Sequence, residues 1–341
     1  MSRSSSLRNY LITRVLMLPV MIWLITSLVF LLLRATPGDP IDALLGPKAP
    51  PEAKEALRQQ LGLNLPLPLQ YLNYMGSLVK LDLGESLTDQ GTKVLQIIQD
   101  FFPATLELAV VAMAIALVLG VGIGAFSASR PDSGWDTSGR LFGIITYAVP
   151  MFWFGMMLQL VFSVWLGWFP VGTRFPTTMV APDGPTKLYL VDSVLGGNFG
   201  QLGAALQYLF LPAASLGVLI SGIFERIVRV NLKQTMAADY VEAATARGIG
   251  PKRILWNHAF RNTLIPVVTI LGLTLAAMLG GAILTEVTFS WPGLANRLYK
   301  AIAQRDYPTV QGITVFFAAI VAVASLAIDL INAAIDPRIR Y

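Results

Sequence analysis

The stretch Val-Glu-Ala-Ala-Thr-Ala-Arg-Gly-Ile-Gly, VEAATARGIG at residues 241–250, is a short polar segment in a chain that is 55% hydrophobic. Long uncharged runs flank it at 193–224 and 262–285. A soluble domain usually carries about a quarter of charged residues, whereas only 13% of this chain is charged. A helix-forming segment between two such runs therefore indicates a loop that joins two membrane spans.

Four further uncharged runs lie at 15–33, 108–129, 141–173 and 307–328. Each run reaches or passes the roughly 18–20 residues needed to cross a hydrocarbon core about 30 Å thick. Helices satisfy every backbone polar group internally, and the runs lack the alternation of β-barrel strands. The chain is therefore predicted to be an all-α polytopic membrane protein with six transmembrane helices.

The predicted boundaries follow these runs. A cytoplasmic N-terminus at 1–14 precedes a first span at 15–33, a long extracytoplasmic loop covers 34–102, and a core domain covers 103–341. Basic residues gather before the first span, between 225 and 262, and at the C-terminus, so the positive-inside rule places both termini in the cytoplasm. The remaining spans are predicted at about 106–129, 141–168, 204–224, 263–285 and 307–329, with a cytoplasmic loop at 225–262.

The long loop contains two predicted helices. PEAKEALRQQLG at 51–62 starts with proline and ends at Gly62, which is typical of a surface helix. QYLNYMGSLVKL at 70–81 places Tyr71, Met75 and Leu78 at helical spacing. This second helix either packs against the bundle or lies among the lipid headgroups.

Glycine and aromatic residues mark the second and third spans. GVGIG at 120–124 places Gly120 and Gly124 at the spacing of close helix–helix contacts. It is not a nucleotide-binding loop, because no Lys-Ser/Thr pair follows it, and the chain contains no phosphate-binding loop elsewhere. The third run contains Pro150 and ends in aromatic residues, Trp165 to Phe169, where an outer aromatic belt is expected.

The composition argues against catalysis and metal binding. The chain has no cysteine and one histidine, His258, for which a structural role is expected. No charged residue lies near the middle of a predicted span, and the nearest, Glu107 and Glu286, are expected to make interfacial hydrogen bonds rather than relay protons. A sodium carrier that uses backbone carbonyls remains an alternative, as does a membrane-embedded enzyme with a serine or threonine nucleophile. The net charge of +5 is explained by membrane topology and does not require a nucleic-acid partner.

The opening segment itself predicts a short helix. Asp239 is a favoured N-cap residue and Glu242 occupies the third helical position, as in a capping box, so a helix is expected from Tyr240 to Arg247. Gly248 is expected to end it, and Gly250-Pro251 to turn the chain into the next helix. A helix this short is marginal in water, so it must be held against a neighbour or a partner. It is either a simple connector or a docking helix, and Ala243 and Ala244 would permit close approach.

Glu242-Ala243-Ala244 followed by Gly248 resembles the EAA loop of ABC-importer permeases, the segment that docks into a cleft of the ATPase subunit. In the general pattern a proline follows the glycine by about thirteen residues. Here Pro266 lies farther from Gly248, which resembles the longer loop of the dipeptide/oligopeptide/nickel branch. Further motifs of that branch occur in order: TPGDP at 36–40, PLQYL at 68–72, DLGES at 82–86, ATLEL at 104–108, GAILTEVTFSWPGL at 281–294, RDYPTVQG at 305–312 and DPRIR at 336–340.

The resemblance is to the first (B-type) permease subunit of this branch. It implies a type I (MetI-like) ABC importer permease fold in the plasma membrane (the inner membrane of bacteria), with no catalytic residue, metal or cofactor of its own. The implied partners are a second related permease, two ABC ATPase subunits that hold ATP and Mg, an extracytoplasmic substrate-binding protein and membrane lipid. The implied cargo is dipeptides or oligopeptides, and nickel complexes, glutathione or oligosaccharides are alternatives.

The resemblance also assigns residues to two roles. The residues expected to couple the chain to the ATPase are Asp239, Tyr240, Glu242, Ala243, Ala244, Arg247, Gly248 and Ile249. The candidates for the translocation path or its gate are Glu107, Glu286, Phe289 and Trp291.

Overall fold

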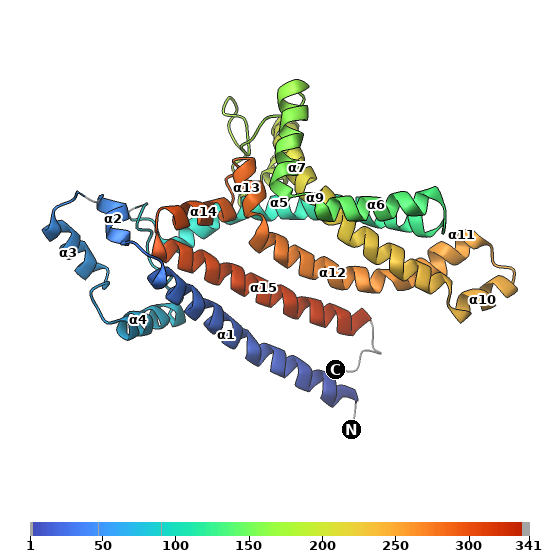
Figure 1. Ribbon diagram of the computed structural model, residues 1–341, viewed down its shortest axis with the longest axis horizontal. Coiled ribbons are helices and arrows are strands. Elements are labelled where there is room, and N and C mark those ends of the chain that lie inside the picture. The colour runs from blue at the N-terminus through green and yellow to red at the C-terminus, as the bar shows by residue number, and fades with distance from the viewer. Residues whose placement is uncertain (1–2, 47, 90, 336–341) are drawn as a thin grey trace. The chain divides into compact units, whose positions relative to one another are not determined.

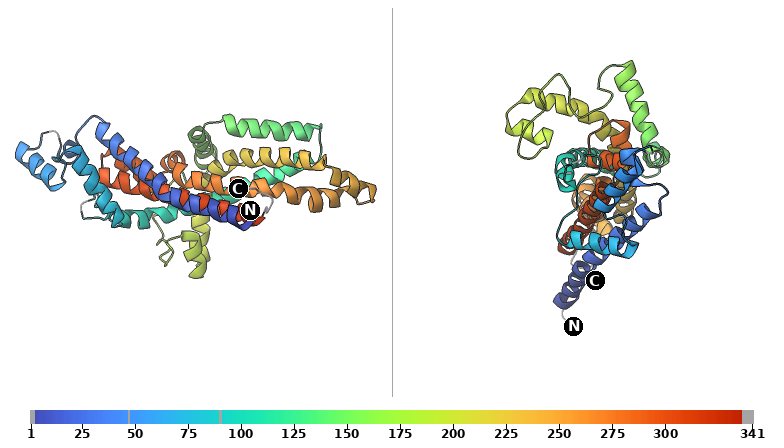
Figure 2. Two further views of the ribbon diagram at one scale, coloured as in Figure 1. Left: turned by 90° about the horizontal axis from the view of Figure 1, so that it is seen from below. Right: turned by 90° about the vertical axis from the view of Figure 1, so that its left-hand side faces the viewer.

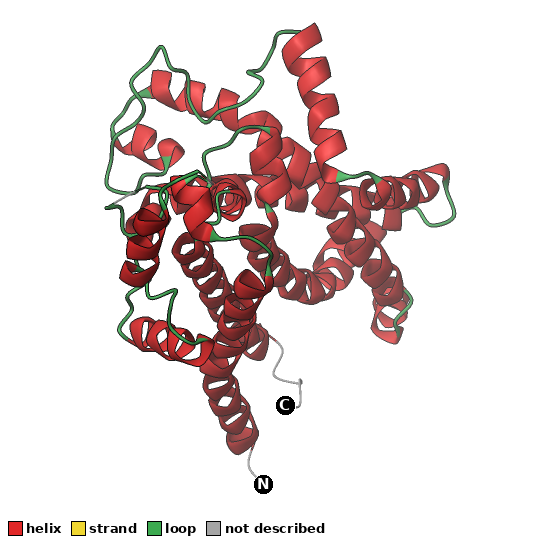
Figure 3. Ribbon diagram, turned by 60° about the vertical axis from the view of Figure 1, so that its left-hand side comes forward, coloured by secondary structure: helices red, strands yellow, loops and turns green. Residues whose placement is uncertain are grey.

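The computed structural model describes residues 3–46, 48–89 and 91–335, and its regular elements there are helices (Figure 3). Within these ranges the β-type pairing is a single bridge between Glu85 and Lys93. Five helices are long and apolar enough to cross a membrane, and one bent pair of helices makes a sixth span when its halves count together. This number agrees with the six spans predicted from the sequence. The DPRIR motif at 336–340 lies outside the described residues.

The chain folds as two compact units, and α5 and α15 contribute to both. The first unit consists of the residues up to Pro103 together with Gly293–Val323. Its helices, labelled in Figure 1, are α1 (Arg3–Ala35), α2 (Pro40–Leu45), α3 (Pro51–Gln60), α4 (Leu67–Val79), the start of α5 (Val94–Ala128), α14 (Leu294–Ala303) and most of α15 (Tyr307–Ile335).

The second unit consists of Ala104–Pro292 together with the chain from Ala324 onward. It contains the rest of α5 and a series of helices and π-helices: α6 (Gly134–Ala148), α7 (Met151–Leu158), η1 (Gln159–Trp165), α8 (Tyr189–Leu195), α9 (Phe199–Met236), α10 (Asp239–Ala246), α11 (Pro251–Arg253), η2 (Ile254–Ala259), α12 (Phe260–Gly281) and α13 (Ile283–Thr288).

In the first unit both predicted loop helices are present as α3 and α4. The Tyr71 hydroxyl of α4 lies 2.7 Å from the Ser27 hydroxyl of α1. The Phe30 ring of α1 packs between Tyr71 and Tyr74, with ring centroids 5.3 and 5.7 Å away. The second loop helix was predicted either to pack against the bundle or to lie among the lipid headgroups. The tyrosine face of α4 packs against another helix, α1.

One buried carboxylate joins two distant motifs in the first unit. Asp306 is the residue before α15, and its Oδ2 accepts hydrogen bonds from the hydroxyls of Ser86 at 2.5 Å and Thr88 at 2.9 Å. Its Oδ1 accepts from the N–H groups of Leu87 at 3.1 Å and Thr309 at 3.3 Å, and the bond from Thr309 caps the helix. The DLGES and RDYPTVQG motifs therefore meet at Asp306.

In the second unit α9 packs against α5 at two glycines. A Cβ atom on Gly120 would lie 2.4 Å from the carbonyl oxygen of Ser221. A Cβ on Gly124 would lie 2.7 Å from the carbonyl oxygen of Glu225. Both distances are shorter than van der Waals contact, so only glycine permits this approach. The close contact predicted from GVGIG is confirmed.

The predicted third span is broken. The helices α6 and α7 meet at an angle of 102° instead of forming one helix through 141–168, and α6 then runs beside α9 (Figures 1 and 2). Val149 has extended backbone with ψ 126°, and Pro150 follows it with ψ 131°. Proline disfavours helical backbone in the residue before it and lacks the N–H that would continue the helix. The break therefore lies at Val149-Pro150.

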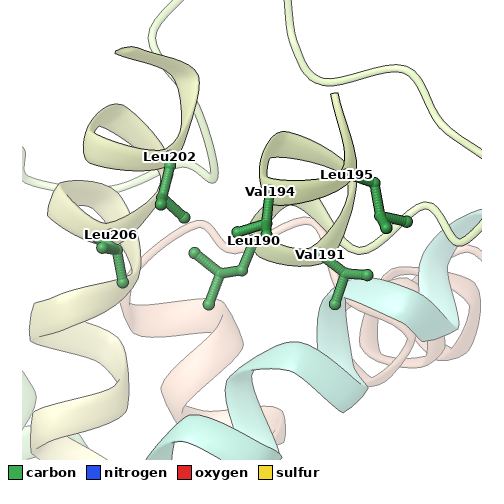
Figure 4. Close-up of a pocket in the computed structure, with 6 residues that line it drawn as sticks. All are labelled: Leu190, Val191, Val194, Leu195, Leu202 and Leu206. Atoms are coloured by element: carbon green, nitrogen blue, oxygen red, sulfur yellow. The ribbon is translucent and has the colours of Figure 1, made fainter. Parts of the chain in front are cut away.

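A segment rich in glycine and proline leads from η1 to α9. Within it, α8 packs against the first turns of α9. Aliphatic side chains line a cavity of about 310 Å³ between the two helices (Figure 4): Leu190, Val191, Val194, Leu195, Leu202 and Leu206.

We predict that Gly120→Ala destabilises the protein while Gly122→Ala does not. The first change forces α5 and α9 apart, and overpacking of this kind costs about 1–3 kcal/mol. Gly122 lies on the same helix, and a Cβ added there would have no atom within 4 Å, so alanine should stabilise by roughly 0.5–1 kcal/mol. Thermal unfolding of the detergent-solubilised protein measures both, and equal unfolding temperatures for the two variants would contradict the packing assignment.

We predict that Asp306 stabilises the fold in a pH-dependent manner. Burial by itself raises the pKa of this carboxyl, but the hydrogen bonds it accepts outweigh burial and hold the pKa below its ordinary value. Its contribution is therefore fully present above the ordinary Asp pKa of about 4 and is lost as the pH falls through the lowered folded-state pKa.

The comparison is between the wild type and Asp306→Asn in denaturant unfolding at a series of pH values. At pH 7 the wild type should be more stable by about 2 kcal/mol, and this difference should shrink in acid. Asp82→Asn is the control, since its exposed carboxylate accepts a local bond from the Gly84 N–H. A difference that stays constant with pH would show that the Asp306 carboxylate is not the stabilising group.

Candidate functional site

The helix that contains the EAA segment, α10, starts one residue earlier than predicted. Asp239 is its first residue, and the preceding Ala238 is the N-cap, with no side-chain hydrogen bond. The Ala238 carbonyl already accepts from the Val241 N–H at 2.9 Å, which closes the first turn. The predicted capping box of Asp239 and Glu242 is therefore wrong. Both carboxylates lie instead in the first turn, where they favourably face the positive end of the helix.

The end of α10 is set by Gly248, as predicted. Gly248 has φ +75°, and its N–H donates to the Thr245 carbonyl at 2.9 Å. The Ile249 N–H donates to the Ala244 carbonyl at 3.2 Å. This pair of bonds is a Schellman motif, in which a left-handed residue satisfies the last carbonyls of a helix. Pro251 then opens α11, also as predicted.

One face of α10 is buried within the chain. Val241 and Ala244 pack with Ile254 of η2 in a small core, and Met236 and Ile249 pack around it. Of the two alanines expected to permit close approach, Ala243 is exposed, whereas Ala244 is buried in this small core, which braces α10. The helix is therefore held by its own chain, which supplies the stability that a helix of 8 residues lacks in isolation.

The opposite face of α10 is open. Its Tyr240 hydroxyl accepts a hydrogen bond from the Asn262 side chain of α12 at 3.0 Å, which ties the start of α10 to the next helix. The predicted coupling residues that are exposed in this structure are Asp239, Tyr240, Glu242, Ala243, Arg247 and Gly248.

A charged cluster that was not predicted from the sequence links α6 to the last turns of α9, which lead into α10. The buried Glu225 accepts a bond from Arg229 Nε at 2.7 Å, and Asp136 Oδ2 accepts from Lys233 Nζ at 2.6 Å. The Arg229 guanidinium lies 4.0 Å from Asp136 Oδ1. Gly143 makes room for Glu225, because a Cβ there would lie 2.6 Å from the carboxylate. The spacing of Glu225 and Arg229 by four residues was the available signal.

Glu107 lies in a buried ion pair with Arg174. Glu107 Oε2 accepts from Arg174 Nη2 at 2.8 Å and from Nε at 3.2 Å, and Oε1 accepts from the Leu190 N–H at 2.7 Å. The guanidinium also lies 3.7 Å from the centre of the Tyr189 ring. The hydrogen bond expected for Glu107 is present, and it holds the 174–190 segment against α5.

Glu286 and Trp291 contact the same part of α5. Glu286 Oε1 accepts from the Thr105 hydroxyl at 2.5 Å, and Trp291 Nε1 donates to the Ala104 carbonyl at 3.0 Å. The Trp291 N–H also donates to the Glu286 carbonyl at 2.8 Å. The Arg174 guanidinium lies 6.0 Å from the centre of the Trp291 ring, so Glu107, Glu286 and Trp291 belong to one cluster.

Phe289 lies at the edge of this cluster, and its carbonyl accepts from the Thr173 N–H at 2.9 Å. Glu107, Glu286, Phe289 and Trp291 are all buried, with exposures of 6%, 0%, 1% and 0%. In this conformation none of the four side chains forms an open surface. Their contacts fasten the 174–190 segment, and the chain from α13 to Trp291, to the beginning of the membrane-spanning part of α5.

His258 lies half-buried in η2. Among the residues that the structure describes, no three His, Asp or Glu side chains gather as they would to hold a metal ion. The candidate site therefore has two parts, and both lie within the second unit. The first is α10, which has one buried and one open face. The second is the buried ion-paired cluster of Glu107, Arg174, Glu286 and Trp291.

Two family models match nearly the whole chain. The binding-protein-dependent transport system inner membrane component matches residues 120–341. The N-terminal part of the same kind of transport component matches residues 7–109. The break between them falls within α5, between its first turns and the glycines that contact α9.

Curated relatives match over almost their full length. A dipeptide transport system permease protein of Alkalihalophilus pseudofirmus is 36% identical, over 96% of this chain and 97% of the relative. A di/tripeptide transport system permease protein of Pseudomonas aeruginosa is 37% identical, over 93% and 94%. An oligopeptide transport system permease protein of Bacillus subtilis is 35% identical, over 97% and 99%.

We predict that Gly248→Val frays the end of α10, because a side chain in the left-handed region costs about 1–2 kcal/mol. Gly250→Val is the matched control, since Gly250 has φ −63° and neither glycine has an atom within 4 Å of an added Cβ. Hydrogen exchange of residues 244–249 should rise about five- to thirtyfold in the first variant alone. Equal exchange in the two variants would contradict the role of Gly248.

Proposed function

Because the chain belongs to the family of binding-protein-dependent transport system inner membrane components, we propose that it is the permease subunit of an ATP-driven importer that moves dipeptides or oligopeptides across the plasma membrane by alternating access. The cargo is inferred from the relatives, which are named as dipeptide, di/tripeptide and oligopeptide permeases. The chain works with other subunits, and ATP hydrolysis takes place on those subunits.

The observation that carries this proposal is the open face of α10. Its apolar stripe is already buried against η2, so the exposed residues are free to meet a partner. Asp239, Glu242 and Arg247 give this face both signs of charge, which suits a polar cleft. The partner is one of two ABC ATPase subunits, which bind ATP and Mg and whose closure pushes α10 relative to the membrane.

Three further features complete the proposal. The loop at 225–262 and both termini lie in the cytoplasm, since basic residues gather there, and 34–102 lies outside. A second related permease completes the path, and an extracytoplasmic substrate-binding protein delivers the cargo. Surrounding lipid contacts the apolar outer surface of the spans.

The ion-paired cluster acts as a gate in this proposal. Its four candidate residues, Glu107, Glu286, Phe289 and Trp291, are buried, so cargo touches them only after the segments they hold have moved. A buried ion pair such as Glu107–Arg174 is costly to break when one partner stays unpaired. Such a contact favours two discrete positions of the loop over a continuum, which is what alternating access requires.

The test is a charge reversal on α10. Glu242→Lys should leave membrane insertion intact and lower the ATPase activity stimulated by the loaded binding protein at least about tenfold, because the reversal replaces an acid by a cation on the docking face and disrupts its charge complementarity with the cleft. Peptide uptake into proteoliposomes that contain the complete complex should fall in parallel.

Glu52→Lys is the matched control. Glu52 is also an exposed acid in the first turn of a helix, α3, so the reversal carries the same helix-dipole cost without touching α10. Its activity should stay within about twofold of the wild type. Normal coupling in Glu242→Lys, or uptake by this chain alone under an ion gradient, would reject the proposal.

A further inference from the structure

The break between α6 and α7 opens onto a cavity of about 510 Å³ in the second unit. Val149 and Met151, on either side of Pro150, both line it. At membrane depth, non-helical backbone is tolerated where it is buried in protein or lines a water-filled cavity. The other lining residues come from α6 and from one face of α9, and include Thr146, Tyr147, Leu219, Ile220, Ile223 and Arg226.

Arg226 carries the one charge among the described residues that line this cavity. It is exposed, and it makes no ion pair within the described part of the chain. The neighbouring Glu225 pairs through its Oε1 with Arg229, at 2.7 Å, and not with Arg226. The guanidinium therefore has donors available on the cavity side, arranged in a planar fork that suits a carboxylate.

The rest of the lining is apolar and adaptable. Leu219, Ile220 and Ile223 form an aliphatic wall, and Met151 adds a flexible side chain that fits varied shapes. The hydroxyl-bearing Tyr147 is 89% exposed at the rim. The cavity volume falls in the range of small-molecule sites, roughly 300–1,000 Å³. One fixed cation beside a non-selective apolar wall suits a ligand with a constant anionic end and a variable remainder.

The backbone at the break adds to the same preference for an anion. Pro150 is the N-cap of α7 without a side-chain hydrogen bond, so the N–H groups of the first turn are not capped by a side chain. Discontinuous membrane helices place such half-helix ends at the substrate sites of transporters. A lipid phosphate would also satisfy Arg226, but it would not require a broken span.

We propose that this cavity is the cytoplasmic end of the transport path that the chain contributes, and that Arg226, just beyond the predicted span at 204–224, receives the C-terminal carboxylate of the peptide. This rests on the proposed function as an importer of peptides. Every linear peptide ends in that carboxylate, so Arg226 orients cargo of any sequence while the apolar wall accepts its side chains.

The natural absence of cysteine from the chain gives a direct test. Arg226→Cys in the complete complex, reconstituted with cysteine-free partner subunits, should lower the maximal rate of dialanine uptake about tenfold or more. Reaction of the introduced thiol with 2-aminoethyl methanethiosulfonate restores a cation and should restore uptake to within about threefold of the wild type. The anionic 2-sulfonatoethyl reagent should not restore it.

Val230→Cys is the matched control, one turn along α9 and 40% exposed, but outside the cavity lining. Neither reagent should change its uptake in a charge-dependent manner. Undiminished uptake by Arg226→Cys, or equal restoration by both reagents, overturns the proposal. So does a loss of co-purified anionic phospholipid in Arg226→Cys that accounts for the uptake defect, because the site would then bind lipid.

The experiment distinguishes an error in the proposed function from an error in the role of Arg226. If the proposed function is wrong, the unmodified complex does not take up dialanine with ATP. If only the role of Arg226 is wrong, the unmodified complex takes up dialanine, and Arg226→Cys shows undiminished uptake, restoration by both reagents or a defect explained by lost phospholipid.

Discussion

The contact between the backbones of α5 and α9 is the constraint on which the second unit depends. Gly120 and Gly124 leave so little space that any side chain there would displace α9. On its other sides α9 holds α6 through the hydrogen bond from Lys233 to Asp136, and it leads at Met236 into the apolar core that holds α10. A shift of α9 would therefore reach the broken span and the EAA helix together.

Neighbouring residues of α9 face different environments and so connect different parts of the site. Glu225 is turned into the charged cluster with Arg229, whereas Arg226 lines the cavity at the helix break. About three turns later the same helix ends beside α10. In the proposed mechanism, α9 therefore contacts the peptide through Arg226 and also leads into α10, which docks on the ATPase. No separate element is needed to couple the two.

Much of the fold could be predicted, because apolar run length and glycine spacing act locally. Pro150 shows where local signals fail. Pro212 and Pro266 also lie inside apolar runs, yet α9 and α12 continue through them. A proline alone therefore does not predict a break; the extended backbone of Val149 and the packing of α6 on α9 decide it. The ion pair of Glu107 with Arg174 could not be predicted from the sequence either, since its partners lie far apart in the sequence and meet only through tertiary packing.

The Schellman turn at Gly248 has a mechanical consequence. Its two hydrogen bonds and the apolar brace leave α10 and η2 without a soft joint, so the pair should behave as a stiff body. A force on α10 would then be transmitted to the start of α12 as displacement, with little absorbed as local bending. A stiff α10–η2 pair would allow even a small movement of the ATPase to displace α12, because a flexible connection would lose a small movement in thermal motion.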